Sequence, residues 1–241
     1  MCGIFSYISK KIINYDFETF KKDNSLLFHR GPDQNLSKEY VSQDYKIFLG
    51  HNRLSIQDLS TNGIQPMSSS NGRFEIIFNG EIYNHKKLRN MLDSKHQIEW
   101  SSTSDTETIV NFYQAYNEDL DFFFKNIEGQ FAFLIYDKKL NTIFISRDLT
   151  GEKPIYLSIQ DGQILISSDL KPIISNPYFK KEISSEALNK YLILNYIPNP
   201  LTIFKKTFKL PPSSYLKINL NEYNFEPSTN FNEFISCSGI T

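Results

Sequence analysis

Cysteine is scarce in this sequence: its 241 residues include only two, Cys2 and Cys237, almost the whole chain apart. Two cysteines placed so far apart do not form the disulfide framework of a small secreted protein, so a reducing compartment is expected. Long hydrophobic runs are also missing. The apolar start of the chain ends at Ser9, which is too short for the core of a signal peptide or for a membrane span. We therefore expect a cytoplasmic protein that does not associate with membranes.

An excess of charge of either sign is absent as well. The 26 basic and 27 acidic residues leave a formal net charge of -1, which offers no electrostatic surface for nucleic acid or for an anionic membrane. No glycine-rich phosphate loop and no internal repeat occurs. The four histidines, His29, His51, His85 and His96, are scattered without the spacing of metal ligands, and no metal site is expected.

The residues that are plentiful favour a folded α+β domain. Hydrophobic residues make up 40% of the chain, with 20 phenylalanines and 14 tyrosines. Ser104 and Glu107 fit a capping box that opens a helix, while Asn79-Gly80 is a turn signal after a strand. Short strands joined by tight turns favour antiparallel sheets. Such strands are predicted at residues 3–8, 45–49, 73–78, 131–136, 142–146, 155–159 and 164–167.

Cys2 is the first candidate for chemistry. Removal of Met1 would leave a cysteine with a free α-amino group, whose pKa of about 7.7–8.0 lets it act as a base at neutral pH. Nucleophile and base then lie on one residue, and a thiol so close to an amine is expected to be more thiolate-like than a buried structural thiol. The alternative is that Met-Cys is a chance start of the chain.

Three further residues and a glycine could complete a site for a free amino acid. The side chain of Asn79 and the backbone N–H of Gly80 could hold a developing oxyanion, although Asn-Gly is also the commonest dipeptide of ordinary turns. Arg53 could bind an α-carboxylate with two parallel hydrogen bonds. Asp105 could accept from an α-ammonium group, but an aspartate at a helix start is also favourable for the helix dipole alone.

Taken together, these residues resemble class II glutamine amidotransferases, and among them the asparagine synthetases that use glutamine. The resemblance runs in order from Cys2 to about Leu220. It is carried by ten segments: 1–5 (MCGIF), 29–33 (HRGPD), 51–56 (HNRLSI), 65–67 (QPM), 78–84 (FNGEIYN), 104–107 (SDTE), 129–133 (GQFAF), 147–156 (RDLTGEKPIY), 167–171 (SSDLK) and 209–212 (KLPP).

The resemblance implies an N-terminal-nucleophile fold, with two stacked antiparallel sheets and helices on the outer faces (αββα). It implies that residues 1–220 are the glutamine amidotransferase domain, and we interpret residues 221–241 as a linker or tail. It further implies roles for individual residues: Cys2 as nucleophile, Asn79 and Gly80 as the oxyanion hole, Arg53 and Asp105 as the groups that hold glutamine, and Leu54, Ser55, Ile56 and Glu81 as pocket lining.

The synthetase half of that family, with its Ser-Gly-Gly-x-Asp-Ser loop, does not occur here. The resemblance therefore implies glutamine hydrolysis without a cofactor, and ammonia supplied for asparagine synthesis to a synthetase domain or subunit that would bind ATP and Mg²⁺. Two alternatives stay open: the same hydrolysis serving another acceptor, such as a sugar acid or a natural product, and a non-catalytic scaffold of the same fold. A homo-oligomer is also left open.

Overall fold

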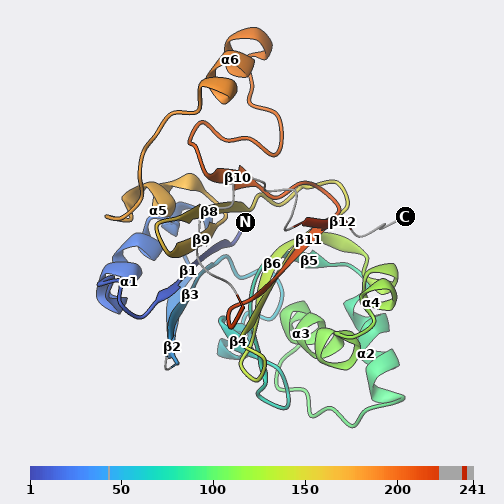
Figure 1. Cartoon of the computed structure of the whole chain (residues 1–241). Coiled ribbons are helices and arrows are strands. Elements are labelled where there is room, and N and C mark those ends of the chain that lie inside the picture. The colour runs from blue at the N-terminus through green and yellow to red at the C-terminus, as the bar shows by residue number, and fades with distance from the viewer. Residues whose placement is uncertain (43, 223–234, 238–241) are drawn as a thin grey trace.

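A computed structural model describes residues 1–42, 44–222 and 235–237, and it contains two six-stranded antiparallel sheets (Figure 1). The first sheet has the order β10-β8-β9-β1-β3-β2 and the second β12-β11-β7-β6-β5-β4. The strands of the first are β1 (Gly3–Lys10), β2 (Gln34–Val41), β3 (Tyr45–Arg53), β8 (Tyr156–Gln160), β9 (Gln163–Ser167) and β10 (Thr207–Lys209). Those of the second are β4 (Met67–Ser68), β5 (Phe74–Ile82), β6 (Gly129–Asp137), β7 (Thr142–Arg147), β11 (Ser214–Asn219) and β12 (Ile235–Cys237).

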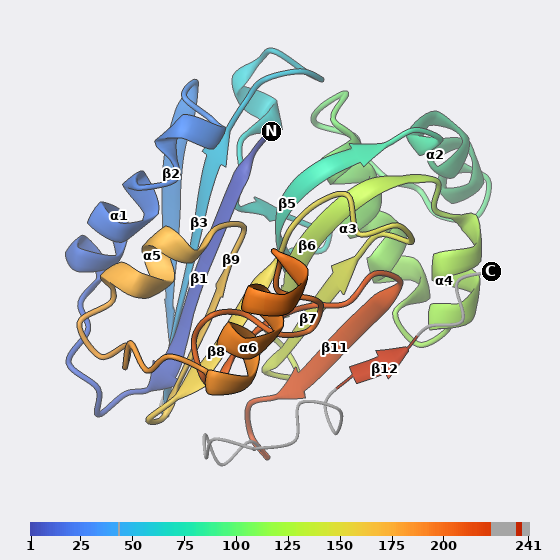
Figure 2. The same ribbon diagram turned by 90° about the horizontal axis from the view of Figure 1, so that it is seen from above.

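Helices cover the outer faces of both sheets, as the two views show (Figures 1 and 2). The first sheet carries α1 (Phe17–Ser25) and α5 (Leu170–Ser175), and the second carries α2 (His85–Asp93), α3 (Asp105–Tyr116) and α4 (Leu120–Asn126). Helix α6 (Ser185–Leu194) stands apart from both sheets, and two short 3-10 turns are η1 (Phe28–Arg30) and η2 (Thr61–Gly63). The layered αββα arrangement expected from the resemblance is confirmed.

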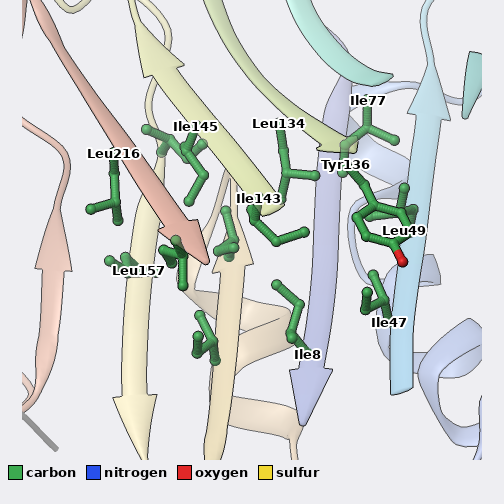
Figure 3. Packing of buried hydrophobic residues seen from close by; sticks show 14 of the residues in the cluster. Ile8, Ile47, Leu49, Ile77, Leu134, Tyr136, Ile143, Ile145, Leu157 and Leu216 are labelled. Carbon is green, nitrogen blue, oxygen red and sulfur yellow. The ribbon is translucent and has the colours of Figure 1, made fainter. Parts of the chain in front are cut away.

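Alternation of side chains along the strands produces three layers of core. Ile8, Ile47 and Leu49 of the first sheet pack between the sheets against residues of the second that include Ile77 and Leu134 (Figure 3). The intervening residues point outward to the helices, where they form an aromatic-rich cluster under each helical layer. The abundant phenylalanine is therefore used mainly where a sheet meets helices.

Two local predictions were wrong. Asn79-Gly80 does not turn the chain, because β5 continues to Ile82 and Gly80 pairs with Phe131 of β6. A Cβ at Gly80 would lie 2.2 Å from the carbonyl oxygen of Gln130, so glycine is needed here for close strand approach. Ser104 does cap α3, accepting from Thr106 N–H, but the Glu107 carboxylate accepts from Ser101 and Ser102 instead of completing a capping box.

The chain after residue 220 is only partly described. Strand β12 (Ile235–Cys237) pairs antiparallel with β11, from Ser214 to Leu216. The rest of the predicted linker beyond residue 222 lies outside the described residues, and the domain limit at residue 220 stays a prediction. No helix within the described ranges is both long and apolar enough to cross a membrane.

The close approach of β5 and β6 makes a prediction about stability. At Gly129, paired with Ile82, a Cβ would lie 2.2 Å from the carbonyl oxygen of Glu81. Gly129→Ala should therefore lower the free energy of unfolding by about 2 kcal/mol or more, measured by denaturant titration. Gly72→Ala is the matched control: φ is +71° but nothing lies within 4 Å, so only the backbone strain of about 1 kcal/mol is expected. Equal losses in the two variants would contradict the crowding argument.

Candidate active site

Every second side chain of a strand points to the same face of the sheet, and this alternation brings the predicted residues together. Cys2 precedes β1 and has the same parity as Ile4 and Ile8, whose side chains face the second sheet. Arg53 likewise shares the inward parity of Ile47 and Leu49 on β3. On β5, Asn79 shares the parity of Ile77, which faces the first sheet. Residues far apart in the sequence therefore meet between the sheets at one end of the sandwich.

The edge of β5 is open at this end because β4 is only two residues long and pairs no further than Ile76. Side chains take over the exposed backbone groups. Gln65 Oε1 accepts from Phe78 N–H at 2.6 Å, and Asp105 Oδ2 accepts from Ile82 N–H at 2.9 Å. Gly80 lies between Phe78 and Ile82, two residues from each. Because the N–H groups of every second residue in a strand point to the same side, the N–H of Gly80 also points to the open edge and not to β6.

The partner strand supports this assignment of direction. Phe131, opposite Gly80, directs its own N–H to the Asp148 carboxylate and its carbonyl to Asp148 N–H, away from β5. The buried His51 of β3, in the other sheet, donates from Nε2 to the Phe78 carbonyl at 3.1 Å. Burial lowers the pKa of His51 to about 3, so this histidine is neutral and joins the two sheets beside the site.

A pocket of about 120 Å³ opens at the uncovered edge, a size that suits one small molecule. It contains every residue predicted for the site except Ser55, whose backbone N–H instead donates to Asp33. The predicted residues that line it are Cys2, Arg53, Leu54, Ile56, Asn79, Gly80, Glu81 and Asp105. Met1, Gln57, Gly63, Gln65, Phe78, Ser104, Thr106, Gln130 and Lys153 complete the lining.

The Cys2 thiol lies against the backbone of Leu54. Its Sγ accepts from Leu54 N–H at 3.4 Å and donates to the Leu54 carbonyl at 3.7 Å, while Arg30 Nε donates to the Cys2 carbonyl at 3.1 Å. Burial raises the pKa of the thiol, although the Leu54 N–H and the chain's amino group act in the opposite direction. The expectation of a thiolate-like Cys2 concerns the chain without Met1, and it stays a prediction.

Asn79 is fully buried, and neither its Oδ1 nor its Nδ2 has a hydrogen-bond partner among the residues that the structure describes. Leaving a buried amide unpaired costs about 1–3 kcal/mol per group, and folded proteins rarely tolerate it without a function. Because Asn79 lines the same pocket as Cys2, its amide is free to bind a molecule placed beside the thiol.

Asp105 begins α3 and is buried, with 5% of the residue exposed. Burial raises its pKa from the ordinary value of 3.8 to about 6, against the lowering effect of hydrogen bonds from Ile82 and Thr106 N–H. At neutral pH the pocket therefore contains a carboxylate whose charge is poorly solvated. Such a group binds a cationic group of a ligand strongly.

The guanidinium of Arg53 donates hydrogen bonds to Gln34 of β2 and to backbone carbonyls of the loop that follows β3. Nη1 donates to Gln34 Oε1 at 3.2 Å and to the Ser60 carbonyl at 2.9 Å, and Nη2 donates to the carbonyls of Gln57 and Asp58. A carboxylate ligand would have to share or displace one of these acceptors. Arg53 thus also fixes the wall of the pocket.

Several lining residues were not singled out from the sequence. Gln57 Nε2 donates to Glu81 Oε1 at 2.8 Å, and Lys153 Nζ donates to Gln130 Oε1 at 3.2 Å. Gln130 and Lys153 lie in segments that carry the resemblance, but only the tertiary structure places them at the pocket. Within the described ranges, no group of three or more His, Cys, Asp or Glu side chains could hold a metal ion.

Comparison with known proteins identifies the family of the chain. A model of the glutamine amidotransferase domain family matches residues 1–229. A putative glutamine-hydrolysing asparagine synthetase 2 of Methanocaldococcus jannaschii is 36% identical over 240 residues, covering 92% of this chain and 45% of the relative. Asparagine synthetase 1 of Bacillus subtilis is 34% identical over 223 residues, covering 90% and 33%. The chain thus spans less than half the length of these two relatives.

Solved structures support the fold. Glutamine phosphoribosylpyrophosphate amidotransferase of Bacillus subtilis matches all of this chain and 49% of its own, with a TM-score of 0.63 and 14% identity. A structure described as the allosteric regulatory enzyme of purine biosynthesis has a TM-score of 0.65 with the same coverage and identity. Since a family model covers nearly the whole chain and the fold agrees with it, this protein belongs to the family of glutamine amidotransferase domains.

Proposed function

We propose that this chain hydrolyses glutamine to glutamate and ammonia, with Cys2 as the nucleophile after Met1 is removed. The observation that carries the proposal is the unpaired, fully buried amide of Asn79 in the same pocket as the Cys2 thiol. An oxyanion hole needs a donor that is fixed in place and free of other partners. Asn79 Nδ2 meets both conditions, and the Gly80 N–H points to the same open edge.

In this mechanism Cys2 Sγ bonds to the side-chain carbonyl carbon of glutamine, and the thiol proton passes to the α-amino group of Cys2. The oxyanion binds Asn79 Nδ2 and Gly80 N–H. Collapse breaks the C–N bond, and the nitrogen leaves as ammonia with the proton from the amino group. Water then adds to the thioester and breaks the C–S bond, giving glutamate and restoring the thiol.

Charge complementarity would orient the substrate. The desolvated Asp105 carboxylate suits the α-ammonium group, and Arg53 supplies positive charge for the α-carboxylate. Leu54, Ile56 and Glu81 would line the pocket, and Ser55 would contribute only through the loop that it shares with them. Met1 also lines the pocket, so its removal would both free the amine and enlarge the site.

The ammonia would serve asparagine synthesis. The relatives at 36% and 34% identity are both named asparagine synthetases, which supports aspartate as the acceptor. The glutaminase step needs no cofactor, whereas ATP and Mg²⁺ would bind a synthetase domain or subunit that receives the ammonia. We expect the protein in the cytoplasm, where reducing conditions keep Cys2 as a thiol.

The central test is a glutaminase assay of the purified chain with glutamine, aspartate, ATP and Mg²⁺. We expect glutamate and ammonia without asparagine or AMP, and mass spectrometry should find Met1 removed. Cys2→Ala should abolish hydrolysis while its circular dichroism spectrum is unchanged. Hydrolysis that persists in Cys2→Ala, or Met1 retained in an active preparation, would exclude the proposed nucleophile.

Asn79→Ala tests the oxyanion hole. Because the oxyanion exists only along the reaction, the variant should lose about 10²–10³-fold in kcat with little change in KM. Removing an unpaired buried amide should not reduce the free energy of unfolding as a hydrogen-bonded one would. Asn90→Ala, at an exposed position of α2, is the matched control and should have wild-type kinetics. A change confined to KM would make Asn79 a substrate-binding residue.

Asp105→Asn should raise the KM for glutamine with a smaller effect on kcat, because the α-ammonium is bound in ground and transition states alike. In the wild type, KM should rise as the pH falls through about 6, where Asp105 becomes protonated. The KM of the variant should not show this rise. A pH profile of KM that is the same in both proteins would argue against Asp105 as the ammonium-binding group.

Stability provides an independent measurement on the same variant. The folded-state pKa of Asp105, about 6, lies above the ordinary 3.8, so the contribution of this group to stability is fully present below pH 3.8 and is lost as the pH rises through about 6. About two pKa units correspond to about 3 kcal/mol. Asp105→Asn should therefore be more stable than wild type at pH 8 by up to this amount, and the gain should vanish near pH 3.

A further inference from the structure

Helix α6 and its flanks expose an unusual number of apolar side chains. Of the nineteen exposed large hydrophobic residues in the described ranges, seven lie between positions 183 and 196. We call these seven the α6 patch: Ile183, Leu188, Tyr191, Leu192, Ile193, Leu194 and Tyr196. Exposure reaches 70% at Leu192 and 78% at Ile193. Seven large apolar side chains exposed within fourteen consecutive positions are an unusual concentration on the surface of a monomer.

The helix is well formed although little of it is buried. Ser184 caps its start by accepting from Ala187 N–H, and Asn195, in the left-handed conformation with φ of 58°, ends it. Its base is anchored, because Ser184 N–H donates to the Ile203 carbonyl and Lys205 N–H to that of Glu182. Only Ala187 of the helix is buried, and α6 projects from the sheets (Figure 1).

The patch has no part in glutamine binding, because every residue that lines the pocket lies between positions 1 and 153. It is also unsuited to nucleic acid or to a membrane surface. Within α6 the only charged residues are Glu186 and Lys190, whereas helices that lie on membranes carry a polar face rich in lysine and arginine. A protein partner is the occupant that fits an apolar and nearly uncharged helix.

The geometry of the helix requires a concave partner. Leu192, Ile193 and Leu194 are consecutive, so they point in directions about 100° apart, and a flat surface cannot cover all three. A two-fold contact between two α6 helices would cover one side only. Three further hollows on the described surface are lined largely by polar and charged residues such as Glu118, Lys11 and Lys139. A second copy of this chain therefore offers a poor receptor for α6.

The relatives supply the better candidate. This chain matches 45% of the Methanocaldococcus protein and 33% of the Bacillus protein, so more than half of each relative lies outside the matched region. We propose that the α6 patch is the docking surface for the ammonia-consuming synthetase domain, which receives the helix in an apolar groove. The proposal rests on the proposed function for the identity of this partner, but its test does not depend on glutaminase activity.

The test compares α6 in two settings by hydrogen exchange measured with mass spectrometry. One sample is this chain alone, and the other is a fusion of this chain to the part of the Methanocaldococcus relative outside the matched region. Ammonia-dependent asparagine formation by the fusion shows that its synthetase part is folded. Amides of residues 185–194 should exchange at least about tenfold more slowly in the fusion than in the chain alone.

A double variant and a matched control assign the effect to the patch. Leu192→Asp with Ile193→Asp should abolish the slower exchange, and both positions are exposed, so the fold should be kept. Val41→Asp, on β2 and 51% exposed, changes an apolar surface residue outside the patch and should leave the slower exchange intact. Glutamine hydrolysis by the isolated chain should be the same in all three proteins. Its absence from all three would refute the proposed function and leave the exchange measurement valid.

Two results would overturn the proposal. One is equal exchange of α6 in the isolated chain and in a fusion that makes asparagine from ammonia. The other is a dimer of the isolated chain, detected by light scattering, that the double aspartate variant alone dissociates, because a second copy would then be the occupant. The second measurement needs no fusion, so a dimer that the double variant dissociates would overturn the proposal even where the fusion lacks ammonia-dependent activity.

Discussion

The site depends on one constraint, the shortness of β4. Two residues of β4 cover β5 as far as Ile76, and the remaining edge of β5 has no neighbouring strand. Its backbone groups are bound instead by the side chains of Gln65, His51 and Asp105. A longer β4 would pair the Gly80 N–H within the sheet, and neither a pocket nor a free donor would exist at this place.

The same edge explains why the site is costly to fold. Asn79 keeps two polar atoms without partners, and Asp105 keeps a carboxylate away from water. Each costs free energy that the three hydrophobic layers must offset. Both groups are complementary to a bound amino acid, since an amide donor suits an oxyanion and a buried carboxylate suits an ammonium. The two groups that lower the stability of the protein alone are therefore the groups whose free-energy cost a bound substrate would reduce.

Much of the fold and most of the site could be predicted from the sequence, for identifiable reasons. Strands appear where apolar residues alternate or run together, and the fold of a resembling family supplies their stacking. The prediction of a turn at Asn79-Gly80 was wrong because Asn-Gly also occurs within strands: glycine is needed here since a Cβ at Gly80 would lie 2.2 Å from the carbonyl oxygen of Gln130. Gln65 and Lys153 could not be assigned to the site, because their place depends on tertiary contacts that no local pattern records. Ser55 was expected at the pocket from the family resemblance, but its neighbours Leu54 and Ile56 line the pocket and Ser55 does not.

Burial of Cys2 and the retention of Met1 together make the translated chain an unreactive form. While Met1 is present, the nitrogen of Cys2 belongs to a peptide bond and cannot accept a proton, and burial raises the pKa of the thiol. The proposed base is then absent, and burial favours the neutral form of the thiol. Removal of Met1 changes both at once, because the new amino group lies on the residue that carries the thiol and provides a positive charge after it takes the proton. In the mechanism proposed above, the thiol proton moves to the amine when the thiol attacks, so the reactive anion need not persist where oxidants could reach it.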